Sequence, residues 1–237
     1  MTELLYMTDC YLREFDAVIT KVDGKFIILD RTAFYPESGG QLTDTGKLVK
    51  TDGTEFKVVF AKKIEGDVSH EIDKEGLSIG DKVHGVLDWD RRYLMMRYHT
   101  AAHVLSTVIY NETNATITGN QLGLDKSRVD FDLELFNREQ LSSYEAKTNA
   151  VLNKSLPVKI EIMPRDEAFK IPALVKLKKL LPETIKDIRV VSIEGFDQQA
   201  CAGAHIGNLG EIGEIEIISL ENKGKSRRRI YFKLKKP

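Results

Sequence analysis

Cysteine is scarce in this chain of 237 residues, which contains only Cys10 and Cys201. Small secreted domains held by disulfides carry a higher density of cysteines, so that class is not supported. No segment approaches the roughly 18 consecutive apolar residues of a membrane-spanning helix. The opening residues MTELLYMTDCYLREFD also lack the basic and apolar regions of a signal peptide. These absences predict a cytoplasmic protein with no membrane partner, in which Cys201 stays reduced.

A strong net charge is missing as well. The 35 basic and 36 acidic residues leave a formal charge of −1 at pH 7, which predicts no global attraction to nucleic acid. The charge is nevertheless uneven, because the segment 223–237 contains eight basic residues and no acidic one. A second basic group consists of Arg91, Arg92 and Arg97. Charge within segments therefore says more about partners than the total does.

The first 85 or so residues have the pattern of short β-strands. Residues 17–30 form two alternating apolar runs joined by Asp23-Gly24, which is a strong hairpin signal. Residues 47–63 repeat the pattern around Asp52-Gly53, and residues 80–90 supply a further strand. Several short strands at this spacing predict a small β-barrel.

The apolar period changes near Trp89 to that of an amphipathic helix, which we place at about 89–112. Its apolar stripe follows 4,3,4,3 spacing and consists of Leu94, Tyr98, Ala101, Leu105 and Val108. The start of this helix is the expected domain boundary. We therefore predict an N-terminal β-barrel domain at 1–88 and a second domain at 89–237.

The second half mixes the two kinds of element. Strands are expected at 127–134, 158–163, 188–195, 213–224 and 227–235, and helices at 137–155 and 172–181. Asn137 is the expected N-cap of the first of these helices, with Gln140 at the capping-box position. The elements interleave without regular βαβ repeats. The predicted fold class is therefore α+β, with a mainly antiparallel sheet in the second domain.

Two pairs of residues have the spacing of metal ligands. His99 and His103 lie on one face of the predicted helix, as two imidazoles that share a zinc ion must. The plainer interpretation is two helix histidines satisfied by hydrogen bonds. Cys201 and His205 repeat the interval around Ala-Gly-Ala, whose small residues permit a tight turn, although Cys201 alone could be a buried structural cysteine.

Three nitrogen donors and one sulfur donor suit zinc better than magnesium or calcium, so we expect one shared zinc ion. A protease of the zincin type needs a glutamate after the first histidine, and Thr100 occupies that position. The metalloprotease interpretation is therefore weak. The other two histidines, His70 and His84, lie in the β region and look incidental.

The motifs HTAAH at 99–103 and CAGAH at 201–205, followed by GNLGEIGEIEI, resemble the editing domain of alanyl-tRNA synthetases. They resemble still more closely the free-standing AlaX-type alanyl-tRNA editing proteins. The segment TAFYPESGGQLTDTG at 32–46 matches the glycine-containing motif of that family. The resemblance covers nearly the whole chain, which has no room for an aminoacylation domain.

The resemblance implies hydrolysis of the ester that joins a wrong amino acid, serine or glycine, to the 3′ adenosine of alanine tRNA. It implies a barrel like those of translation factors, packed on an α/β editing domain. It also implies that the zinc-site residues are His99, His103, Cys201 and His205. The expected partner is mischarged alanine tRNA, and no protein partner is inferred.

The chemistry expected at this site leaves alternatives open. Zinc can activate water or hold the substrate, but catalysis needs an open coordination position, and four protein ligands close a tetrahedron. Either His205 is bound loosely or not at all, or the shell expands to five, or the metal positions substrate while another water attacks. We expect His99, His103 and Cys201 to be the firm ligands. The attacking group is expected to be a zinc-bound or nearby water, so no catalytic side chain is assigned.

Several polar residues are candidates for substrate binding. Gly39 and Gly40 would let backbone amides approach a ligand, although the plainer interpretation is a turn. A site that hydrogen-bonds the serine hydroxyl would reject alanine, which lacks it. The side chains that could read this hydroxyl, each also compatible with a plain turn or strand role, are Gln41, Thr118, Asn120 and Gln121.

Two further groups have both a structural and a functional interpretation. Asp130 and Asp132 alternate along a predicted strand as a solvated face would, although one of them could orient a histidine or take a proton. The tail residues Arg227, Arg228 and Arg229 suit either a solvated edge strand or contacts with tRNA phosphates.

Two other functions remain as alternatives. One is a non-catalytic RNA-binding module with a structural zinc. The other is an editing hydrolase of related fold that acts on a different aminoacyl-tRNA, such as that of the threonyl system.

Overall fold

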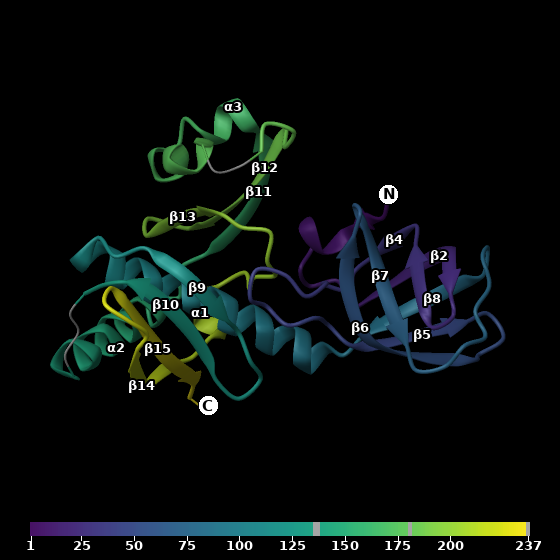
Figure 1. Ribbon diagram of the computed structural model, residues 1–237, viewed down its shortest axis with the longest axis horizontal. Helices are drawn as coiled ribbons and strands as arrows, with labels where there is room; N and C mark the ends of the chain where they lie inside the picture. Colours follow the sequence, from purple (N-terminus) through teal and green to yellow (C-terminus); the bar gives the residue numbers. More distant parts are fainter. Residues whose placement is uncertain (135–137, 180–181, 236–237) are drawn as a thin grey trace. The chain divides into compact units, whose positions relative to one another are not determined.

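The protein is described by a computed structural model that covers residues 1–134, 138–179 and 182–235 (Figure 1). It separates into two compact units. The first consists of Met1–Met96 with Gln121–Leu124, and the second of Arg97–Asn120 with Asp125–Pro237. The predicted α+β fold class, with an N-terminal barrel, is confirmed.

The first unit is built around a closed six-stranded barrel with the strand order β2-β3-β7-β6-β5-β8. Its strands are β2 (Glu14–Asp23), β3 (Phe26–Leu29), β5 (Gly46–Lys50), β6 (Glu55–Ile64), β7 (Asp67–Ile72) and β8 (Lys82–Leu87). Ile19, Ile27 and Leu48 are buried in the barrel core, and the residues on either side of each are more exposed, so burial alternates along the chain. This alternation is the reason that these segments form strands.

The first hairpin differs from its prediction by one residue. Asp23 pairs with Phe26, so the two-residue turn consists of Gly24 and Lys25 instead of Asp23 and Gly24. Gly24 has φ of +57°, which a glycine adopts without strain.

A loop at 32–46, which contains the SGGQ sequence, leaves the barrel after a short parallel pair of β1 (Glu3–Leu4) and β4 (Arg31–Thr32). A 3-10 helix, η1 (Leu5–Met7), follows β1. The ends of the loop are held together because Asp44 N–H donates to Tyr35 O at 3.0 Å and Tyr35 N–H donates to Asp44 Oδ2 at 2.7 Å. The loop is therefore anchored at its base by backbone and carboxylate contacts.

Arg92, in the helix α1 (Trp89–Thr113), reaches the same loop. Its fully buried guanidinium forms an ion pair with Asp44, which is also fully buried. It also donates to Cys10 O at 3.0 Å and to Ala33 O. One buried cation thus joins the helix to the loop and to the N-terminal segment.

The helix α1 confirms the predicted helix at 89–112. Its residues up to Met96 belong to the first unit and those from Arg97 to the second. The expected division of the chain into separable domains after residue 88 stays a prediction. The segment Gln121–Leu124 returns to the first unit, where Leu122 N–H donates to Gly40 O at 2.7 Å and Leu122 forms a parallel bridge with Gln41.

The second unit contains two sheets. Four strands have the order β14-β15-β10-β9, and three antiparallel strands have the order β11-β12-β13. The strands are β9 (Ile117–Gln121), β10 (Ser127–Asp132), β11 (Val158–Pro164), β12 (Asp187–Ile193), β13 (Asp197–Ala200), β14 (Ile215–Asn222) and β15 (Arg227–Leu234). The mainly antiparallel arrangement is confirmed, while β9 and β13 are strands that the sequence pattern did not predict.

The helix α2 (Arg138–Leu152) lies beside β14, where Asn149 exchanges two hydrogen bonds with the backbone of Ile215. Short helices follow at α3 (Arg165–Ala168), η2 (Pro172–Lys179) and η3 (Leu209–Glu211). The helix expected at 172–181 is therefore of the 3-10 type. Residues 180–181 of that predicted helix lie outside the described residues. The predicted cap Asn137 and the tail residue Lys236 lie outside them as well. No helix in the described ranges is long and apolar enough to span a bilayer.

Candidate metal centre

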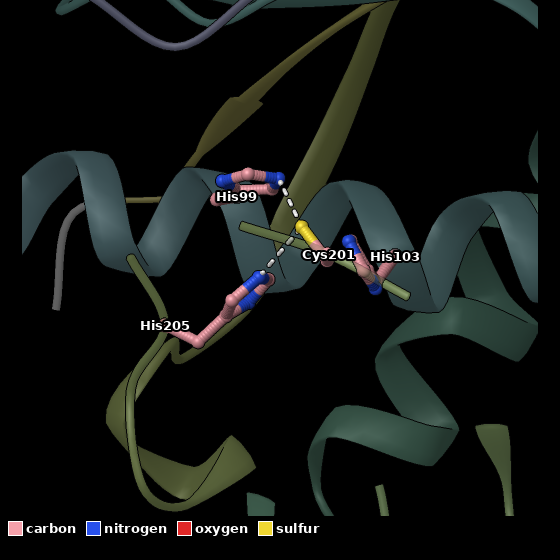
Figure 2. A group of neighbouring side chains, drawn as sticks. All are labelled: His99, His103, Cys201 and His205. Carbon is pink, nitrogen blue, oxygen red and sulfur yellow. Dashed lines mark hydrogen bonds between the residues drawn. The ribbon is translucent and has the colours of Figure 1, made fainter. Parts of the chain in front are cut away.

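Four side chains of the second unit converge at one point (Figure 2). His99 and His103 project from one face of α1, while Cys201 and His205 come from the loop that follows β13. One potential ligand atom from each lies within 4.8 Å of the others. The structure therefore brings the two predicted pairs together, as a shared metal ion requires.

Two of the separations between donor atoms fit zinc. Cys201 Sγ lies 3.5 Å from His99 Nε2 and 3.4 Å from His205 Nε2. A sulfur about 2.3 Å and a nitrogen about 2.0–2.1 Å from one tetrahedral zinc ion are about 3.6 Å apart. These two pairs of atoms are thus already separated as ligands of a single ion would be.

Gly203 allows this close packing. A Cβ atom at this position would lie 1.9 Å from His99 Cε1, well inside van der Waals contact. Gly203 N–H also points to Cys201 Sγ at 3.4 Å. The small residues of the CAGAH loop therefore serve a steric need in addition to permitting a turn.

Two of the histidines have a polar neighbour on their other ring nitrogen. His205 Nδ1 lies 3.0 Å from Thr100 Oγ1, and His103 Nδ1 lies 3.7 Å from Asp197 Oδ2. The second distance suits an ion pair but is too long for a hydrogen bond. Sequence reasoning missed both contacts as site features, because they join residues that are 105 and 94 positions apart.

The electrostatics of the cluster favour a thiolate at Cys201. Burial opposes ionisation of the thiol, but the interactions of the sulfur with His99, His205 and His103 hold the pKa of Cys201 well below its ordinary value. Since the thiolate is the form that binds metals, Cys201 is suited to act as a ligand.

The two histidines that face other groups differ in their pKa values. Burial together with the charge of His99 lowers the pKa of His205 to about 3. Burial also lowers the pKa of His103, but Asp197 and Cys201 outweigh it and raise the pKa to about 9. Without a metal ion, the cluster therefore combines an anionic sulfur with a cationic imidazole.

A pocket of about 950 Å³ adjoins the cluster within the second unit. Asp197, which faces His103, lines it together with Ser106 and Tyr110 of α1 and Phe196 of the turn before β13. Its size lies within the range of about 300–1,000 Å³ that is usual for small-molecule sites. None of the four candidate ligands lines this pocket, and Asp197 is the lining residue that contacts His103.

The predicted substrate-binding residues lie in two places. In the first unit, Ser38 and Gln41 exchange backbone hydrogen bonds around Gly39 and Gly40, which have φ of +58° and +81°. The turn interpretation is therefore confirmed, and open space surrounds the Cβ position of Gly39. A role of this turn in binding a ligand stays a prediction.

The other candidates belong to β9. Thr118 is exposed, and Asn120 and Gln121 follow at the end of the strand. The Oδ1 atom of Asn120 is buried and accepts no hydrogen bond from the described residues. Gln121 precedes Leu122, the residue that pairs with the loop at Gly40 and Gln41. Their role in reading a substrate stays a prediction.

The acidic residues considered on β10 have another role. Both carboxylate oxygens of Asp130 accept from Arg229, at 2.7 and 2.8 Å, and Arg128 also donates to Asp130. Asp132 is exposed. The alternative in which one of these two acids assists a metal-site histidine has no support at Asp130, because arginines donate to both of its oxygens. Asp197 is the acid that faces the cluster.

The tail arginines of β15 are not equivalent. Arg228 is buried and donates to Asn222 Oδ1, Gly224 O and Glu134 O. Arg229 is held by Asp130, whereas Arg227 is exposed. Contact of these arginines with tRNA stays a prediction, and Arg227 is the one whose guanidinium is best placed for it.

Comparisons with known proteins agree with this geometry. A profile of tRNA synthetases class II (A) matches residues 6–91, and one of the threonyl and alanyl tRNA synthetase second additional domain matches residues 188–231. The alanyl-tRNA editing protein AlaX-M of Methanosarcina mazei is 55% identical, over 99% of this chain and 97% of that protein. The chain belongs to the AlaX-M family of alanyl-tRNA editing proteins.

Other relatives extend this result. The AlaX-M protein of Saccharolobus solfataricus is 43% identical, over 99% of this chain and 100% of its own length. The alanine–tRNA ligase of Thermofilum pendens is 38% identical over 100% of this chain, but over only 26% of the ligase. The family thus shares this architecture with one part of a much larger enzyme, and the predicted resemblance is confirmed.

Proposed function

We propose that this protein is a zinc-dependent hydrolase that removes serine or glycine from mischarged alanine tRNA. The observation that carries the proposal is the convergence of His99, His103, Cys201 and His205, with sulfur–nitrogen separations that match a single zinc ion. Membership of a family of alanyl-tRNA editing proteins supports the substrate class. The ester of an aminoacyl-tRNA is the bond to be broken.

When bound, zinc would supply a Lewis acid that polarises a carbonyl or lowers the pKa of water. The protein's own groups would hold the ion and the substrate. Cys201 supplies an anionic sulfur, and the histidines supply nitrogens from α1 and from the loop after β13. The pocket beside Asp197 would accommodate part of the substrate near the metal site.

Selection against alanine would rest on polar groups that pair with the serine hydroxyl. Asn120 is the strongest of the predicted candidates, because its buried Oδ1 accepts no hydrogen bond from the described residues. An amide oxygen in this state would gain a partner when a hydroxyl arrives. Gln41, Gln121 and Thr118 remain further candidates, and Gly39 and Gly40 would present backbone amides.

The central test compares wild type with Cys201→Ala in deacylation of seryl-tRNA, with zinc content measured on both. We expect the variant to lose zinc and activity together, because the thiolate is the only anionic donor of the cluster. Cys10→Ala is the matched control, since Cys10 is buried in the first unit and its sulfur contacts Tyr6 O. Full activity of Cys201→Ala without zinc would contradict the proposal.

A structural zinc in a non-catalytic RNA-binding protein is the second candidate, and the four-donor set favours it, because closed tetrahedral sites are usually structural. Chelation separates the two. Under this alternative the metal-free protein unfolds, and the intact protein never deacylates seryl-tRNA. Under the proposal the intact protein deacylates seryl-tRNA, and activity depends on zinc.

The substrate range needs its own comparison. Alanine tRNA charged with serine, glycine or alanine is presented to the same enzyme. We expect cleavage of the seryl or glycyl ester and protection of the alanyl ester. Equal rates on alanyl- and seryl-tRNA would exclude an editing role, and cleavage restricted to a threonine-specific tRNA would favour the alternative editing hydrolase.

A further inference from the structure

Thr100 belongs to the HTAAH motif and contacts residues of the CAGAH loop. It follows His99 on α1 and is completely buried. Its Oγ1 lies 3.0 Å from His205 Nδ1 and accepts from Ile206 N–H at 3.4 Å. The hydroxyl therefore joins the helix of one motif to the loop of the other.

The far side of the His205 ring faces the sulfur. His205 Nε2 lies 3.4 Å from Cys201 Sγ, while Nδ1 faces Thr100. A neutral imidazole carries one N–H and one lone pair, and only the lone pair can bind a metal ion. His205 can therefore be a ligand through Nε2 only when Nδ1 carries the proton.

We propose that the Thr100 hydroxyl is a positioning group that accepts Nδ1–H of His205 and so leaves the Nε2 lone pair for the metal ion. The proposal rests on the proposed zinc site and deepens it, because it assigns a residue that makes His205 a firm ligand. Polar partners of this kind fix the tautomer and the ring orientation of metal-binding histidines in many sites.

The burial of Thr100 separates its hydroxyl from solvent. The side chain is 0% exposed, and its oxygen faces an imidazole and a backbone amide. It cannot act on a substrate directly. The contact with Ile206 N–H does raise a competing explanation, in which the hydroxyl merely holds the CAGAH loop in place.

The test measures metal affinity and metal geometry, both independent of deacylation. Zinc affinity is obtained by competition with a chelator, and the absorption spectrum of the cobalt(II)-loaded protein reports the ligand set. We expect Thr100→Val, which removes the hydroxyl with little change in shape, to lower zinc affinity by about 10–100-fold and to alter the cobalt spectrum. Thr100→Ser keeps the hydroxyl and should restore both properties.

A matched control removes another buried threonine hydroxyl. Thr148 of α2 is 0% exposed, and its Oγ1 has no hydrogen-bond partner among the described residues. Thr148→Val should leave zinc affinity and the cobalt spectrum unchanged. A loss of affinity in this variant equal to that of Thr100→Val would overturn the proposal, because it would show a general effect of core substitution.

A double-variant cycle separates positioning from loop support. In a His205→Ala background the hydroxyl has no imidazole to position, so Thr100→Val should change zinc affinity by less than about twofold. An equal loss in both backgrounds would mean that Thr100 supports the loop, and the proposal would be wrong. Wild-type affinity in His205→Ala would overturn it too, since His205 would then not be a ligand.

Folding is followed by circular dichroism of the metal-free proteins, and Thr100→Ala takes the place of Thr100→Val in the cycle if the valine variant is unfolded. The readouts also distinguish this proposal from the proposed function. A protein that binds zinc through the Thr100–His205 pair but never cleaves seryl-tRNA would contradict the proposed function alone.

Discussion

Gly203 shows how one missing side chain sets the geometry of the metal centre. Its backbone is not in the left-handed region, so alanine would be acceptable to the chain itself, but the three atoms nearest to an added Cβ all belong to the His99 ring. We expect Gly203→Ala to displace His99 or the loop and to lower zinc affinity at least tenfold. Chelator competition measures this loss.

The exposed neighbour Ala202 supplies the control for Gly203→Ala. Ala202→Ser adds one atom to the same loop without facing the cluster, so its zinc affinity should match wild type. If both variants bind zinc as wild type does, His99 is not confined by the loop, and the close approach at Gly203 has no bearing on metal binding.

The buried His70 of β7 is expected to make the stability of the barrel depend on pH. It is completely buried, with Nε2 2.9 Å from Thr32 Oγ1, and burial lowers its pKa to about 4. Below pH 6.5 the His70 side chain is protonated in the unfolded chain, whereas in the folded protein it is protonated only below about pH 4. The free energy of unfolding should therefore fall by about 3 kcal/mol as the pH drops across this interval.

Urea unfolding of the full chain at several pH values checks the role of His70. His70→Gln carries no titratable group, and its unfolding free energy should lack this fall. His84→Gln is the control, because His84 is partly exposed and its pKa is raised by a hydrogen bond from its ring to Asp16. A pH dependence identical in His70→Gln and wild type would show that His70 does not cause it.

The ligand residues could be predicted from the sequence, and their partners could not. The two intervals of four residues place His99 with His103 and Cys201 with His205 by local geometry alone. The contacts of Thr100 and Asp197 depend on how a helix meets a loop about a hundred residues later. No local pattern carries that information, and the alternation that singled out Asp130 reflected its pairing with Arg229 instead.

At the scale of elements, the first turn of α1 is fastened to the loop at 32–46 by the buried pair of Arg92 and Asp44. Breaking such a pair leaves one buried charge without compensation. We expect Asp44→Asn to lower the free energy of unfolding by about 3–5 kcal/mol. Urea unfolding followed by the fluorescence of Trp89, the single tryptophan, reports on this turn directly.

An exposed pair in the same barrel is the control for Asp44→Asn. Lys47 and Glu55 are 2.5 Å apart, but both side chains are largely accessible to water. Lys47→Ala should therefore have little effect on stability. A stability of Asp44→Asn equal to that of Lys47→Ala would mean that the loop is not held by Arg92.

Most long elements could be predicted, whereas short ones could not. The stripe from Leu94 to Val108 identifies α1, and the alternation of β2, β6 and β8 identifies the barrel strands. β13 has only four residues, and β9 reads as a loop because it contains glycine and asparagine. These strands form because neighbouring strands supply hydrogen-bond partners, which is a tertiary effect.

At the scale of the whole molecule, the charge of −1 means that a tRNA must be attracted by local groups. Arg227 is exposed on β15, whereas Arg228 is buried against Asn222 and Glu134. Arg227→Ala should weaken tRNA binding and reduce its salt dependence without lowering stability. Arg228→Ala should instead lower the free energy of unfolding by about 2 kcal/mol, because it removes the hydrogen bonds of a buried, charged guanidinium.

Binding of labelled alanine tRNA at several salt concentrations, together with thermal unfolding, measures the effects of the two arginine variants. Lys82→Ala, which alters an exposed residue of the barrel, controls for the loss of one positive charge. If Arg227→Ala binds tRNA as wild type does at every salt concentration, the tail of β15 is not part of the tRNA-binding surface.

The return of Gln121–Leu124 to the first unit has a consequence for the order in which the protein can form during synthesis. Leu122 is nearly inaccessible to water and supplies the N–H that pairs with Gly40 O. When the ribosome has just released the last barrel strand, this piece has not yet been made. The loop that carries Gly39 and Gly40 therefore lacks its hydrogen-bond partner at Gly40 O until about 35 more residues have been synthesised.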